Sequence, residues 1–181
     1  MSQALRLSSL LLLACASFAS QAAPQLVILV RHAEKAAEPR EDPTLSEVGT
    51  ARAKALAQTL ADAKVGAVLT SPLRRTRDTG TPVAEAVGIK PQAIGFEGGT
   101  VAHVAAVAAA VRAQAVDTVL VVGHSNTVPA IVAALGGPKL ADFCESSFDQ
   151  LLLLRLDSEP PRLLRARYGL ADPVAAAGCS P

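Results

Sequence analysis

Two short runs of apolar residues constrain the fold more than any other feature of this chain. Residues 26–30 read Leu-Val-Ile-Leu-Val, and residues 118–122 read Thr-Val-Leu-Val-Val. Continuous apolar runs of this length, rich in β-branched residues and without polar alternation, are typical of strands that are buried on both faces. Such strands belong to a parallel sheet that helices cover on both sides. The sequence therefore predicts an α/β fold.

Segments with helical features lie between these two strands. Residues 44–47 (Thr-Leu-Ser-Glu) read as a capping box, and the helix after it is predicted to bury a face formed by Val48, Ala51, Ala55 and Leu60. Ser71 and Pro72 predict the cap and the first position of a second helix, which Pro82 is expected to bend or restart. Residues 100–115 predict a third helix, rich in Ala and Val.

The order of the elements predicts a three-layer α/β/α sandwich. A short strand is expected at residues 67–70, and glycines and a proline at 136–138 end the helix that follows the strand at 118–122. Residues 150–156 and 162–167 flank a turn that is too short for a crossover helix. We therefore expect a mostly parallel sheet with right-handed crossovers and a C-terminal antiparallel hairpin.

The first 22 residues have the features of a signal peptide. Arg6 provides a positive charge, residues 7–18 are largely apolar, and residues 20–22 (Ser-Gln-Ala) form a small-x-small cleavage site. The apolar run is shorter than the roughly 20 residues that a membrane-spanning helix needs. We expect residues 1–22 to be removed, leaving one domain at 23–181 in the periplasm or outside the cell. The alternative is a lipoprotein signal that would anchor the domain through Cys15.

Composition and cysteine content narrow the partners of the mature chain. The formal net charge is +1, only 3% of residues are aromatic, and there is no Trp. A nucleic-acid partner is therefore not expected, because the basic excess and the stacking platforms are lacking.

Outside the leader the cysteines are Cys144 and Cys179. In an oxidising compartment they either form a disulfide or remain two free thiols.

Two histidines follow the two predicted buried strands. Arg31 and His32 come directly after the first strand, and His124 follows the second. In a parallel sheet both strands end at the same edge, where open α/β sheets bind their ligands. Either histidine alone could be structural, but their matched positions favour a shared site.

A basic run begins the second predicted helix, with arginines at positions 74, 75 and 77. The helix dipole already places about half a positive charge at this terminus, so cations here are unfavourable unless they are solvated or bind an anion. Arginine suits phosphate because its planar fork donates to two oxygens. A neutral imidazole can attack phosphorus directly. The sequence therefore predicts a phosphoryl site formed by His32, His124, Arg31 and Arg75.

Four motifs resemble the histidine phosphatase (phosphoglycerate mutase-like) superfamily: LVRHAEK at 29–35, LSEVGTARA at 45–53, SPLRRT at 71–76 and VVGHSN at 121–126. The resemblance places the family's arginine–histidine pair on Arg31 and His32, its helix arginine on Arg75 and its second histidine on His124. Glu34 matches the acidic residue after the pair. The implied enzyme is a metal-independent phosphatase without an organic cofactor, which acts on a small phosphorylated substrate through a phosphohistidine on His32.

Departures from the family pattern concern the substrate and the proton donor. Many mutase-like members carry an asparagine where this chain has Glu38, so a mutase is less favoured. Larger acid phosphatases place an aspartate directly after the second histidine, where this chain has Ser125. We expect Glu97 to supply the proton for the leaving group, because family members often carry a carboxyl donor in this loop. The alternative is that Glu97 is an ordinary loop glutamate.

Three other interpretations remain. One is a phosphoglycerate mutase, and another is a catalytically weak module that binds phosphorylated ligands. The third is a metal site built from His32, Glu34, His103 and His124. That site is disfavoured because no H-E-x-x-H or comparable spacing occurs, and His103 is predicted to lie on the surface.

Overall fold

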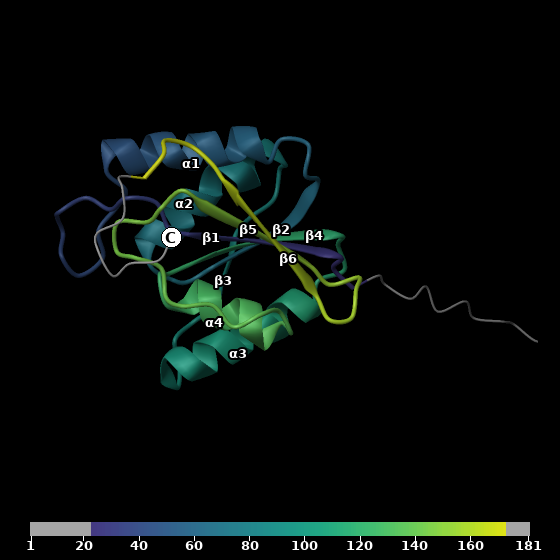
Figure 1. Ribbon diagram of the computed structural model, residues 1–181. Coiled ribbons are helices and arrows are strands. Elements are labelled where there is room, and N and C mark those ends of the chain that lie inside the picture. Colours follow the sequence, from purple (N-terminus) through teal and green to yellow (C-terminus); the bar gives the residue numbers. More distant parts are fainter. Residues whose placement is uncertain (1–22, 173–181) are drawn as a thin grey trace, which may run out of the picture.

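The two apolar runs form the central strands of a six-stranded sheet. The computed structural model describes residues 23–172 (Figure 1). β1 (Leu26–Arg31) pairs in parallel with β4 (Thr118–Gly123), and β4 pairs in parallel with β2 (Val65–Thr70). The short β3 (Gln92–Ala93) lies beyond β2. The strand order is β3-β2-β4-β1-β5-β6, so both long apolar strands are interior.

Helices cover both faces of this sheet, as predicted. α1 (Glu47–Thr59) and α2 (Arg74–Ala86) lie on one face, and α3 (Gly99–Arg112) and α4 (Thr127–Ala134) lie on the other (Figure 1). The buried residues of β1 alternate between the two layers. Val27 and Leu29 pack in a cluster with α3 and α4, whereas Ile28 and Val30 pack with α1 and α2. The three-layer prediction is therefore confirmed.

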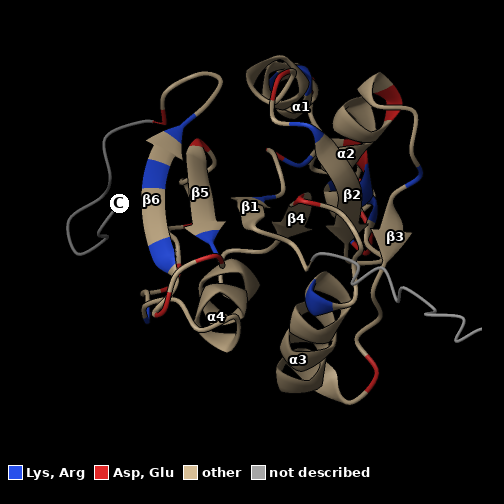
Figure 2. Cartoon of the chain, turned by 90° about the vertical axis from the view of Figure 1, so that its right-hand side faces the viewer, with Lys and Arg blue, Asp and Glu red and all other residues tan. Residues whose placement is uncertain are grey.

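The C-terminal hairpin is also confirmed. β5 (Gln150–Arg155) pairs antiparallel with β1, and β6 (Arg162–Arg167) pairs antiparallel with β5. β6 is an edge strand and carries arginines along its exposed length (Figure 2). Charged side chains on such an edge disfavour pairing with another chain. Among residues 23–172, no helix has both the length and the apolar character that crossing a membrane requires.

The predicted buried face of α1 is only partly correct, because Leu60 is buried but Val48 and Ala51 are not. The N-cap is Ser46, whose Oγ accepts a hydrogen bond of 3.1 Å from the main-chain nitrogen of Gly49. Gly49 is pressed against the main chain of Glu34, where a Cβ atom would have no room. This contact turns Gly49, Ala53 and Leu56 inward and leaves Val48 and Ala51 exposed. The glycine contact, which hydrophobic periodicity does not reveal, sets the orientation of the helix.

The predicted start of α2 and its bend are also wrong. The helix begins at Arg74 rather than at Pro72, and Asp42 Oδ1 caps it by accepting the Arg74 amide at 2.9 Å. Ser71 Oγ instead accepts the main-chain nitrogen of Leu73 at 3.3 Å. Pro82 lies inside the helix without interrupting it. Buried residues on both sides of the proline pack α2 against the sheet, and this packing outweighs the missing hydrogen bond.

Candidate active site

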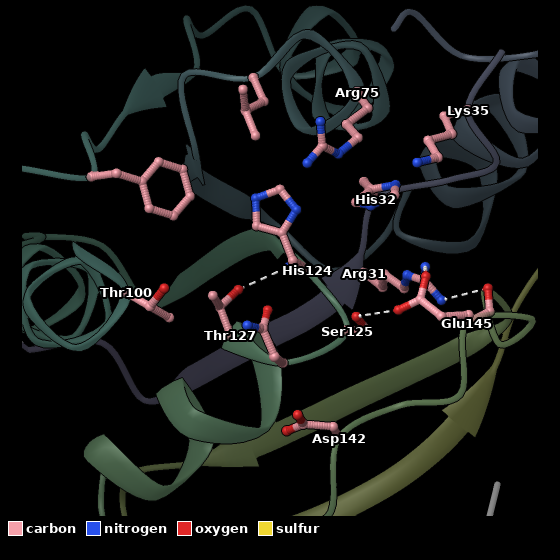
Figure 3. A pocket seen from close by; sticks show the side chains of 13 residues that line it. Arg31, His32, Lys35, Arg75, Thr100, His124, Ser125, Thr127, Asp142 and Glu145 are labelled. Carbon is pink, nitrogen blue, oxygen red and sulfur yellow. Dashed lines mark hydrogen bonds and ion pairs between the residues drawn. The ribbon is translucent and has the colours of Figure 1, made fainter. Parts of the chain in front are cut away.

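The carboxyl ends of β1 and β4 open into a cavity of about 500 Å³ (Figure 3). Its lining residues are Arg31, His32, Lys35, Leu73, Arg75, Phe96, Thr100, His124, Ser125, Asn126, Thr127, Asp142 and Glu145. The structure thus brings together four of the five residues that the sequence singled out. Glu97 is not among the residues that line this cavity.

The imidazole of His32 is buried and fixed in one orientation. The side chain is only 5% exposed, and the main-chain nitrogen donates to Gly123 O at 2.9 Å, which ties β1 to β4. Nδ1 lies 2.8 Å from Ala33 O. Since a carbonyl can only accept, Nδ1 carries the proton and Nε2 keeps a free lone pair. Burial, followed by the charges of Arg31 and Arg75, lowers the pKa of His32 to about 4.

His124 lies beside His32, and it too is neutral. The two ring centroids are 5.3 Å apart, with an edge-to-face angle of 63°. The Nε2 atom of His124 is 3.1 Å from Ser71 Oγ, and its main-chain nitrogen donates to Thr127 Oγ1 at 2.9 Å. Burial, followed by the charges of His32 and Arg75, lowers the pKa of His124 to about 3. Both imidazoles are therefore uncharged at neutral pH.

The guanidinium of Arg31 is held by the segment that precedes β5. Nη1 donates to the carbonyl oxygens of Cys144, Glu145 and Ser147 at 2.8, 2.9 and 3.1 Å. Nη2 donates to Glu145 Oε2 at 2.8 Å, and the guanidinium carbon lies 4.2 Å from the ring centroid of Phe148. Burial lowers the pKa of Arg31, although Glu145 opposes this effect. The orientation of Arg31 therefore depends on residues 144–148.

Arg75 is the arginine of the basic run that faces the cavity. Arg74 and Arg77 are exposed, whereas Arg75 is partly buried and lines the cavity (Figure 3). Within residues 23–172, no hydrogen bond or ion pair engages its guanidinium, and burial lowers its pKa. The main-chain oxygen of Arg75 accepts a hydrogen bond of 2.7 Å from Thr79 Oγ1. Thr79 Oγ1 in turn accepts a hydrogen bond of 2.9 Å from the main-chain nitrogen of Ala33. This chain of bonds fixes the base of Arg75 next to His32.

A third arginine, Arg52, supports the site through Glu34, a role that the sequence did not predict. Arg52 is 4% exposed, and its Nε and Nη2 atoms donate to both carboxylate oxygens of Glu34 at 2.7–3.0 Å. Its Nη1 donates to Tyr168 O and Leu170 O at 3.2 and 2.8 Å. Burial alone would raise the pKa of Glu34, but the hydrogen bonds from Arg52 hold it below its usual value. Glu34 therefore faces this support rather than the cavity.

The loop that carries Glu97 turns a different side chain into the cavity. Glu97 is exposed and its carboxylate lies over Gly95, while the adjacent Phe96 lines the cavity. His103, predicted at the surface, is instead 1% exposed. Its Nδ1 bonds to Gly95 O at 2.7 Å and its ring stacks on Phe96 at a centroid distance of 4.1 Å. The surface assignment of His103 is therefore wrong, because this histidine anchors the loop.

Two carboxylates line the cavity, and both come from the segment before β5. They belong to Asp142 and Glu145. Ser125 Oγ, directly after His124, donates to Glu145 Oε1 at 2.9 Å. Burial would raise the pKa of Glu145, but Ser125 and Arg31 lower it overall. Glu145 could not be predicted from the sequence, because no recognisable motif surrounds it.

The remaining sequence predictions concern the cysteines and a possible metal site. Cys144 is disulfide-bonded, whereas its predicted partner Cys179 lies outside the described residues, so that pairing stays a prediction. Cys15 and the predicted signal peptide also lie outside them. In the part of the chain that the structure describes, no group of three or more His, Cys, Asp or Glu side chains could hold a metal ion.

Comparison with known proteins identifies what this chain resembles. A model of the histidine phosphatase superfamily (branch 1) matches residues 27–94, which include Arg31, His32 and Arg75. A solved structure from Agrobacterium tumefaciens, assigned as the phosphohistidine phosphatase SixA, is 28% identical. The match covers 81% of this chain and 99% of that one, with a TM-score of 0.62. No curated protein sequence matches this chain.

Two further solved structures share the fold at lower identity. The protein histidine phosphatase SixA in complex with tungstate is 20% identical over 78% of this chain and 96% of that one, with a TM-score of 0.61. A mycobacterial glucosyl-3-phosphoglycerate phosphatase is 17% identical over 81% and 99% of the two chains, with a TM-score of 0.57.

Proposed function

This chain belongs to the histidine phosphatase superfamily, and from that premise we propose that it hydrolyses a phosphomonoester or a phosphoramidate through a phosphohistidine on His32. One observation carries the proposal. The Nδ1 proton of His32 is committed to Ala33 O at 2.8 Å, which leaves Nε2 unprotonated in a ring that burial keeps neutral. A neutral imidazole with its lone pair available is the form that can attack phosphorus.

The reaction has two displacements at phosphorus. In the first, a bond forms between His32 Nε2 and phosphorus while the bond to the leaving group breaks, and the leaving atom takes up a proton. In the second, water loses a proton and attacks phosphorus, the N–P bond breaks, and the lone pair returns to Nε2. Arg75 and Arg31 stabilise the charge that is spread over the phosphoryl oxygens. His124, whose ring centroid lies 5.3 Å from that of His32, adds a third polar contact to these oxygens.

The available side chains supply both the nucleophile and the positive charge, so we propose that the reaction needs neither a metal ion nor an organic cofactor. Turnover of nitrophenyl phosphate in excess chelator tests this. A panel that compares phosphoramidates, including phosphohistidine, with phosphomonoesters would define the substrate class. The SixA likeness favours the phosphoramidate, whereas the glucosyl-3-phosphoglycerate phosphatase shares only the fold.

Replacement of His32 tests the intermediate. His32→Ala and His32→Asn should each lose turnover by more than about 100-fold, because the covalent route disappears. Asparagine is the closer mimic, since its amide can still donate to Ala33 O. Quenching the unmodified protein during turnover should trap an acid-labile, alkali-stable phosphoryl group on His32. Label that persists on either variant would show that another residue is the nucleophile.

We also propose that the domain acts outside the cytoplasm. The proposal rests on the leader pattern, with Arg6 before a largely apolar run and a small-x-small exit at residues 20–22. Mass spectrometry of protein isolated from its natural compartment should find a mature start near Ala23. A diacylglycerol on Cys15 would replace soluble export with a lipid anchor. The same spectra, recorded without reductant, test the pairing of Cys144 with Cys179.

A further inference from the structure

The proposed reaction needs a proton donor near the leaving group. This chain has Ser125, which is not an acid, directly after the second histidine. The structure shows that a carboxylate nevertheless lies at this place. Ser125 Oγ donates to Glu145 Oε1 at 2.9 Å, so a residue 20 positions away brings its carboxylate beside the second histidine (Figure 3). The serine therefore holds a carboxylate that the motif itself does not contain.

Glu145 is also fixed at its second oxygen. Arg31 Nη2 donates to Oε2 at 2.8 Å, and Arg31 Nη1 binds the main-chain oxygen of the same residue at 2.9 Å. The other carboxylate of the cavity, Asp142, has no hydrogen bond or ion pair with a described side chain. Only Glu145 is thus both in the cavity and oriented by groups that belong to the proposed phosphoryl site.

We infer that Glu145 is the general acid and base of this reaction, an assignment that rests on the proposed function. In the first displacement its carboxyl group gives a proton to the leaving oxygen or nitrogen as the bond to phosphorus breaks. The carboxylate then takes a proton from the water that attacks the phosphohistidine. Each turnover therefore returns Glu145 to its starting protonation state.

The charge around Glu145 provides a reason for it to gain a proton when substrate binds. Arg31 and Ser125 now stabilise its carboxylate. A bound phosphoryl group brings negative charge and competes for Arg31, and both effects favour the protonated carboxyl. Phosphate esters have a second pKa of about 6, so a substrate that binds as the monoanion can supply the proton that Glu145 gains.

Leaving-group chemistry tests this role with Glu145→Gln. The side chain of Glu145 is 83% exposed, so the fold should be retained, and glutamine preserves an acceptor for Arg31. An aryl oxide leaves without protonation, whereas an alkyl oxide needs a proton, and loss of a general acid typically costs about 100- to 10,000-fold. Glu145→Gln should therefore reduce kcat/KM for glycerol phosphate by about 100-fold or more relative to its effect on kcat/KM for nitrophenyl phosphate.

Two further variants complete the experiment. Glu97→Gln examines the rival donor, and Glu85→Gln is the matched control, since Glu85 is exposed near the C-terminal end of α2. A selective loss on glycerol phosphate in Glu145→Gln, with Glu85→Gln unchanged, supports the assignment. Equal losses on both substrates, no loss, or a selective loss in Glu97→Gln instead would overturn it.

The state of His32 separates this inference from the proposed function. If the unmodified protein forms a phosphohistidine and Glu145→Gln shows no leaving-group selectivity, only the assignment of Glu145 fails. If no phosphohistidine forms in the unmodified protein, the proposed function itself fails.

Discussion

Acid should destabilise this protein through its two cavity histidines. His32 and His124 have pKa values of about 4 and about 3 in the folded protein, against about 6.5 in the unfolded chain. The unfolded chain therefore binds protons that the folded protein does not accept. The stability that the two neutral histidines contribute is complete above about pH 6.5. It is lost as the pH falls from there towards the folded-state pKa values of about 4 and about 3.

The expected loss can be calculated from these shifts. At pH 5 each histidine should cost about 2 kcal/mol of the free energy of unfolding, or about 4 kcal/mol together, relative to neutral pH. This is a large fraction of the roughly 5–15 kcal/mol that stabilises a typical domain. Carboxylates with lowered pKa values, such as Glu34, act in the same direction, but mainly at lower pH. Asp172, whose pKa burial raises, acts in the opposite direction.

Urea unfolding of the wild type and of His32→Gln/His124→Gln, at about pH 7 and about pH 5, isolates the histidine contribution. The carboxylates are the same in both proteins, so their effects cancel in the comparison. On acidification the wild type should lose about 4 kcal/mol more than the double variant. Equal losses in the two proteins would refute the conclusion that these imidazoles are buried in the neutral form.

Two substitutions test the arginines. Arg75→Ala should lower kcat/KM by about 100- to 1,000-fold, because it removes a donor to the phosphoryl oxygens, whereas the exposed Arg77→Ala should have little effect. Near-normal kcat/KM in Arg75→Ala would assign the phosphate to another arginine. Arg52→Met should lower the free energy of unfolding by about 3–5 kcal/mol, because Glu34 loses its partner, and Lys54→Met on the exposed side of α1 is the control. A loss in urea unfolding no larger than that of the control would show that Glu34 does not need Arg52.

The sequence predicted the centre of the site well because its residues lie at the carboxyl ends of two buried strands that are parallel neighbours in the sheet. Arg31 is the last residue of β1, His32 follows it directly, and His124 follows β4. Since these strands are parallel neighbours with Arg31 opposite Gly123, the side chains that follow them must emerge together. Arg75 could be predicted for another reason, because a cation in the first turn of a helix is unfavourable without an anion.

The errors arise where tertiary contacts override local patterns. Periodicity placed Val48 on the buried face of α1, but the contact of Gly49 with the chain after β1 rotates that face away. The same rotation buries Arg52, a residue that hydrophobic patterning assigns to solvent. His103 lies on a helix of Ala and Val without any motif, and its Nδ1 bonds to a carbonyl of the loop that leads into this helix. Hydrophobic periodicity reveals none of these contacts.

The segment before β5 explains why the proton donor was harder to find than the nucleophile. Strands fix the directions of His32 and His124, whereas the main-chain oxygens of residues 144–147 fix Arg31. Glu145 belongs to that same segment, so a single stretch of chain orients Arg31, the proposed phosphate ligand, and presents a carboxylate to it. The disulfide at Cys144 restrains this stretch at its first residue. Loops tolerate substitution better than the strands they connect, so relatives that keep all four motifs can still differ in the residue at this position. The identity of the acid in such a protein must therefore be found from the contacts of its second histidine and its first arginine, rather than from the motifs that contain them.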